Sequence, residues 1–148
     1  MDLFVIVGNP HTRKSSVMRC LTGCFNRSLR DIQPTDGRAP LRMYVRVGAL
    51  QETHCTAEDL AAEAQQRRAQ AVLCGLWPSA HPHDPLRWPA AADYLAAFEA
   101  MGWRRRAVAL LGQNPGGLRG AQVMAFPQAP TQPVNVTAHA VRQFFGWI

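Results

Sequence analysis

The chain has 148 residues, of which 47% are hydrophobic and 18% are charged. This length fits a single domain, 1–148, and the composition excludes a disordered protein. No apolar run approaches the roughly 20 residues of a membrane span, and no secretory signal precedes the first apolar segment, so we expect a cytoplasmic protein with no membrane span.

Charge indicates the kind of partner the protein could bind, and cysteine content indicates the redox state of its thiols. The formal net charge of +6 favours anionic partners. The excess of arginine over lysine, together with the many alanines, indicates a bacterial genome rich in GC. Four cysteines are too few for a disulfide framework, so we predict reduced core thiols at Cys20, Cys24, Cys55 and Cys74.

Strand-like apolar segments alternate with helical patterns from the start of the chain. Residues 3–7 predict a strand, and residues 15–25 predict a helix. In residues 41–47 apolar side chains alternate with polar or aromatic ones such as Tyr44 and Arg46. This period of two predicts a half-exposed strand at or near a sheet edge.

The same alternation continues through the second half of the chain. The helix predicted at 89–101 directs Tyr94, Leu95, Phe98 and Met101 inward. Alternating strands and helices predict an α/β fold, a three-layer sandwich with a mainly parallel sheet. The other predicted elements are a helix from Thr56 to Arg68, strands at 71–77, 107–111 and 121–126, and a final helix that begins at Asn135 or Thr137.

A phosphate-binding pattern follows the first strand. Gly8, four residues, Arg13, Lys14 and Ser15 have the spacing of a Walker A loop, except that arginine replaces the usual glycine before the lysine. In such a loop backbone N–H groups and the lysine hold phosphates, and the serine binds magnesium. The competing interpretation is an ordinary turn that opens a helix, capped by Asn9 or Thr12. The predicted nucleotide-binding residues here are Gly8, Asn9, Thr12, Arg13, Lys14, Ser15 and Ser16, with Ser15 as the metal ligand.

Beginning with this loop, the order of elements resembles the small GTPases of the P-loop superfamily over most of the chain. Thr35 lies where that family places its magnesium-sensing threonine, and residues 107–114, which end at Asn114, are similar to its guanine-recognition strand and loop. The resemblance implies a small GTPase-like P-loop topology. It also implies GTP or ATP with magnesium as the ligand, and adds Thr35 and Asn114 to the nucleotide-binding residues.

Several motifs of that family are altered. Pro115 and Gly117 replace its lysine and aspartate, which does not support guanine specificity. No Walker B aspartate follows a hydrophobic strand, and hydrolysis would need Asp31 or Asp36 to fold back onto the metal. The sequence therefore predicts a degenerate P-loop nucleotide-binding protein, a pseudo-GTPase with weak or no hydrolysis. The alternative is a non-catalytic interaction or scaffold protein on the same fold that no longer binds nucleotide.

Two other clusters carry chemistry-bearing side chains. His81, His83 and Asp84 follow the strand at 71–77 and could bind a metal with His54 or Cys55, although histidines in a loop are more often solvated. Basic clusters precede two core strands, at the sheet edge opposite the phosphate loop. We favour a protein partner or a role in solubility for them over nucleic acid, since no aromatic residues interleave. These basic residues are Arg67, Arg68, Arg104, Arg105 and Arg106.

Overall fold

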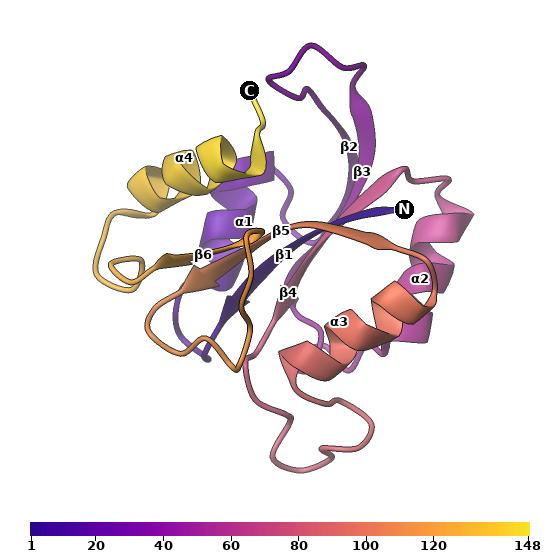
Figure 1. Ribbon diagram of the computed structural model, residues 1–148, viewed down its shortest axis with the longest axis vertical. Helices are drawn as coiled ribbons and strands as arrows, with labels where there is room; N and C mark the ends of the chain where they lie inside the picture. Colours follow the sequence, from indigo (N-terminus) through magenta and orange to yellow (C-terminus); the bar gives the residue numbers. More distant parts are fainter.

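The computed structural model describes residues 1–148 as one six-stranded sheet with four helices (Figure 1). The predicted α/β class is confirmed. The strands are β1 (Asp2–Gly8), β2 (Arg27–Ile32), β3 (Leu41–Ala49), β4 (Ala71–Leu76), β5 (Arg104–Leu111) and β6 (Val123–Phe126). The helices are α1 (Lys14–Thr22), α2 (Ala57–Gln66), α3 (Ala91–Ala100) and α4 (Val134–Phe145).

The strand order in the sheet is β2-β3-β4-β1-β5-β6. Every neighbouring pair is parallel except β2 and β3, which form an antiparallel hairpin. Strand β4 therefore lies between β1 and β3. The carboxyl ends of the five parallel strands meet on one side of the sheet, here called the carboxyl edge, and their first residues form the amino edge.

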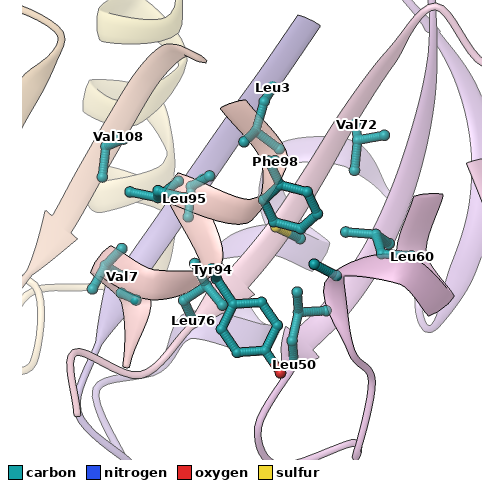
Figure 2. Close-up of a cluster of buried hydrophobic side chains, with 14 of the residues drawn as sticks. Leu3, Val7, Leu50, Leu60, Val72, Leu76, Tyr94, Leu95, Phe98 and Val108 are labelled. Carbon is teal, nitrogen blue, oxygen red and sulfur yellow. The ribbon is translucent and has the colours of Figure 1, made fainter. Parts of the chain in front are cut away.

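Two helices cover each face of the sheet, which makes three layers (Figure 1). Side chains of α1 and α4 pack with Phe4, Ile6 and neighbouring residues on one face. On the other face α2 and α3 pack with alternate residues of the same strands, and Figure 2 shows Tyr94 and Phe98 of α3 among them. Because both faces are covered, β1 and β4 are buried along their whole length, as their continuous apolar sequences predict.

Local sequence signals account for several element ends. Helix α2 begins after Thr56, whose side chain accepts a hydrogen bond from the Asp59 N–H while the Asp59 carboxylate accepts one from the Thr56 N–H. Helices α1 and α4 both end at glycines with positive φ, Gly23 and Gly146. No helix has the length and apolar character needed to cross a membrane.

The structure corrects four details of the sequence analysis. Strand β2 was not predicted, because its mostly exposed residues lack an apolar alternation. Strand β3 lies next to the edge but is not half-exposed, since α2 covers the side on which Tyr44 and Arg46 lie. Met101 is 37% exposed, because α3 ends at Ala100. Cys20 is an exposed free thiol and not a core residue, whereas the other three cysteines are buried.

Candidate phosphate-binding site

The loop between β1 and α1 lies at the carboxyl edge, where loops from β3, β4, β5 and β6 also converge. Gly8 begins it and is required by close packing. A β-carbon at Gly8 would overlap Thr12 Oγ1 and would lie 3.1 Å from the Leu111 carbonyl oxygen. Thr12 in turn is held by Asn9, whose carbonyl oxygen accepts hydrogen bonds from the Thr12 hydroxyl at 2.7 Å and from its N–H at 3.3 Å. The loop is thus a compact turn closed on the Asn9 carbonyl.

Arg13 adopts the left-handed backbone conformation, with φ 68° and ψ 28°, directly before α1. Glycine is the residue that takes this conformation without strain, and it is the residue that the Walker A pattern places here. The arginine side chain does not fill the loop. Its Nη1 donates to the Gln132 carbonyl oxygen at 3.0 Å, in the segment that follows β6. Arg13 therefore has a glycine-like backbone conformation, and its side chain points to the segment after β6.

Lys14, the first residue of α1 and the only lysine of the chain, is the central group of the site. Its residue surface is only 6% exposed, and Nζ donates a hydrogen bond of 2.8 Å to the Asn9 carbonyl oxygen. None of the six ion pairs of the molecule includes Lys14. Burial lowers its pKa from 10.5 to about 8, and the negative charge of Glu52 opposes this shift.

The start of α1 presents free backbone donors beside this ammonium group. The first helical hydrogen bond runs from the Val17 N–H to the Arg13 carbonyl oxygen at 2.9 Å, and no side chain caps the helix. The N–H groups of Lys14, Ser15 and Ser16 therefore have no acceptor within the helix. Together with the helix dipole, they form a partly positive surface suited to an anion.

A cavity of about 540 Å³ opens beside the loop, lined by residues of the β1, β5 and β6 loops. Asn9 and Thr12 contribute to its wall from the loop between β1 and α1, and Asn114 contributes from the loop after β5. Asn114 Nδ2 donates to Asn9 Oδ1 at 3.1 Å. The structure thus brings Asn114 to the loop between β1 and α1.

Thr35 lies away from this site. It follows β2 in the hairpin turn, and the register Ile32 with Leu41 puts that turn at the amino edge. There the Thr35 N–H and hydroxyl both donate to the Gly146 carbonyl oxygen, at 2.9 and 3.3 Å. Thr35 is therefore separated from the other predicted nucleotide-binding residues. Those that lie together at the carboxyl edge are Gly8, Asn9, Thr12, Arg13, Lys14, Ser15, Ser16 and Asn114.

The two carboxylates that could have reached a metal ion at Ser15, those of Asp31 and Asp36, lie elsewhere in the structure. Asp31 pairs in register with Arg42 near the start of β3, and Asp36 forms an ion pair with Arg38 in the hairpin turn, so neither approaches Ser15. The acidic group whose charge acts on Lys14 is Glu52, which the sequence analysis missed. The position of Glu52 just after a strand could have indicated it. The predicted strand ended at Val47, however, and β3 runs two residues further.

The histidine cluster forms an aromatic group at the same edge. The ring of His54 stacks on that of Trp88, with 4.0 Å between the ring centroids. The ring centroid of His81 lies 5.6 Å from those of both His54 and His83. His81 Nδ1 accepts a hydrogen bond from the His83 N–H, and no three His, Cys, Asp or Glu side chains are placed to hold a metal ion. Burial raises the pKa of the nearby Cys55 thiol to about 11.

The basic clusters lie at the amino edge, and acidic groups neutralise part of them. Asp2 pairs with Arg104 at 3.6 Å and with Arg106 at 3.2 Å, and Arg105 pairs with Glu99 at 3.3 Å. On the helix α2 side, the Arg67 guanidinium lies over the ring of Tyr44 and Arg68 has a positive φ.

Comparison of the chain with protein-family models, with curated proteins and with solved structures found no match.

Proposed function

We propose that this protein binds a nucleoside triphosphate, ATP or GTP with magnesium, through a degenerate P-loop formed by residues 8–15, and that it hydrolyses the nucleotide weakly or not at all. The observation that carries the proposal is the buried ammonium group of Lys14. It lies in a closed loop at the start of a helix, has one carbonyl partner and has no ion pair. A phosphate would supply the missing counter-charge.

The surroundings of Lys14 support the same ligand. The free N–H groups at the start of α1 and the left-handed backbone at Arg13 are features that a phosphate-binding loop requires. Ser15 is the proposed magnesium ligand, and the cavity beside Asn114 is the proposed place of the base. The proposal includes a small GTPase-like P-loop ancestry and a cytoplasmic location, where nucleoside triphosphates are available.

Weak or absent hydrolysis follows from the acidic groups at hand. Phosphoryl transfer needs a held metal ion and an oriented water molecule. Glu52 is the carboxylate whose charge acts on Lys14, and it is exposed and forms no ion pair or hydrogen bond of its own. A side chain without fixed contacts is poorly suited to positioning a metal or a water molecule.

Calorimetric titration of nucleotide-stripped protein with MgATP and MgGTP tests the proposal. We expect saturable binding that Lys14→Ala weakens by about tenfold or more, because a charged hydrogen bond to phosphate is lost. Arg19→Ala is the matched control, since it removes one positive charge from the last turn of the same helix. Absence of heat with both nucleotides at millimolar concentration would contradict the proposal.

The second candidate is a non-catalytic interaction protein that has kept the fold and lost the nucleotide. The basic amino edge favours it, since five arginines gather there against two carboxylates, Asp2 and Glu99. An acidic protein surface would complement that edge. This candidate predicts that nucleotide binding is absent and that charge reversal at the amino edge abolishes partner binding.

A further inference from the structure

Two neighbouring arginines, one of them buried, lie outside the proposed nucleotide site. Arg46 of β3 and Arg27 of β2 are partners in the antiparallel register, and both reach the carboxylate of Glu63 on α2. The Arg46 side chain is only 5% exposed, whereas that of Arg27 is 55% exposed. Two cations therefore share one carboxylate, and the less buried of the two faces solvent.

The charge of Glu63 is already balanced by Arg46, without Arg27. Arg46 Nη1 donates to both carboxylate oxygens, at 2.6 and 2.7 Å, and the Tyr44 hydroxyl lies 3.3 Å from Oε2. The contact from Arg27 Nη1 is longer, 3.2 Å. A carboxylate of this kind needs one guanidinium to balance its charge, so the charge of Arg27 remains available to another anion.

Arg46 also keeps one side of its guanidinium for another acceptor. Because Nη1 holds Glu63, the Nε and Nη2 groups form the remaining side. Nε is buried and has no hydrogen-bond partner, and Nη2 has only the Thr53 hydroxyl, at 3.3 Å. Oxyanions bind arginine through two parallel N–H groups of this kind. An unpaired buried N–H of a charged group is costly, and an oxyanion would remove that cost.

A groove provides room for the anion at this place. Two adjoining cavities of about 410 and 390 Å³ share Arg27, Arg46 and Thr53 in their walls. The Thr53 hydroxyl is hydrogen-bonded to Arg46 Nη2 and lies 3.1 Å from the Ala49 carbonyl oxygen. The walls of the groove therefore contain the Thr53 hydroxyl and an arginine whose Nε–Nη2 side has only this one hydrogen bond.

We propose that this groove is an anion-binding site that takes a phosphate or carboxylate group through Arg27, Arg46 and Thr53. The site is next to the phosphate loop. A β-carbon built on Gly48 would lie 3.6 Å from Thr53 Cγ2 and 3.8 Å from Ser15 Oγ. If the proposed nucleotide site is also correct, the groove would hold a second anionic molecule, or a second anionic group of the ligand, close to the magnesium ligand.

Calorimetric titration of the Lys14→Ala protein with inorganic phosphate, and separately with acetate, at constant ionic strength tests the groove without the loop lysine, and the Arg27 variant then separates the groove from the start of α1. We expect saturable binding of at least one of the two anions, which Arg27→Gln weakens by about tenfold or more. The better-bound probe shows whether the groove prefers a phosphate or a carboxylate group. Arg42→Gln, which removes the same charge from an exposed position near the start of β3, should change the affinity less than twofold.

A second readout guards against a folding defect. Thermal unfolding should show that Arg27→Gln is folded, as its exposure predicts, and the Arg46 Nε–H resonance should shift with anion concentration in the Lys14→Ala protein. The proposal is overturned if neither anion saturates, if Arg27→Gln and Arg42→Gln have equal effects, or if the Nε–H resonance of Arg46 does not move. A failure of nucleotide binding in the wild-type protein would leave these results unaffected.

Discussion

Replacement of Lys14 by methionine should stabilise the free protein. Burial lowers the pKa of Lys14 from 10.5 to about 8, which corresponds to about 3 kcal/mol of free energy against the charged form in the folded state. Methionine keeps the apolar stem and removes the charge. The Asn9 carbonyl oxygen stays satisfied in the variant, because it also accepts from the Thr12 hydroxyl and N–H. We expect a gain of about 2 kcal/mol in unfolding free energy at pH 7.

The pH dependence of this gain has a defined sign. Below pH 8 Lys14 is protonated in both the folded and the unfolded state, so the wild-type protein bears the full cost of burying the charge. Between pH 8 and 10.5 the folded protein binds fewer protons at this site than the unfolded chain. The wild-type stability therefore rises relative to that of the variant, and the difference disappears above pH 10.5.

Urea denaturation of both proteins at pH 7, 9 and 10.5 measures the effect. A midpoint that rises in Lys14→Met at pH 7, with an unchanged slope, would support the reasoning. Arg19→Met is the control, since Arg19 is exposed on the same helix and should change stability little. Equal stability of variant and wild type at pH 7, or a gain that grows with pH, would refute the claim that Lys14 is a buried, unpaired cation.

Three further predictions concern the frame of the site. Arg13→Gly should change the unfolding free energy by less than about 1 kcal/mol, whereas Arg13→Val should lower it by about 1–3 kcal/mol, because a β-branched residue is strained at φ 68°; urea denaturation of the pair checks this. Tyr94→Phe should cost about 1–2 kcal/mol in thermal unfolding, since the buried Tyr94 hydroxyl donates to the Cys55 carbonyl oxygen at 2.7 Å (Figure 2 shows the ring), and an unchanged melting temperature would contradict it. Gly75→Ala should lower stability by about 1–3 kcal/mol, because its β-carbon would lie 2.6 Å from the Gly48 carbonyl oxygen and force β3 and β4 apart; a fully stable variant in the same assay would show that the strands can yield.

The central strands were predictable from the sequence because they are buried on both faces of the sheet. Strands β1 and β4 have helices on both faces, so an unbroken apolar run is sufficient to identify them. Strand β2 has a polar sequence and pairs only with β3, and no local pattern distinguishes such a strand from a loop. The burial of Arg46 depends on Glu63, which is 17 residues away on another element, and a local pattern cannot reveal that pair.

The candidate site was predictable only where it is local. Gly8, Lys14 and Ser15 belong to one turn, so their spacing in the sequence was enough to place them together. Thr35 was misplaced because the sequence does not show to which edge the β2–β3 turn projects. Glu52 was missed because its place relative to Lys14 depends on the exact end of β3 and on the packing of the loop that follows.

The proton equilibrium of Lys14 tests the proposed function most directly. Because the chain has a single lysine, protein grown with lysine labelled with ¹³C at the ε-carbon gives one lysine resonance, and its chemical shift follows the charge of Nζ. We predict a pKa of about 8 for the free protein, and a higher pKa with saturating MgATP or MgGTP, because a phosphate anion stabilises the charged form. A titration curve that neither nucleotide changes would contradict the proposal that Lys14 binds phosphate.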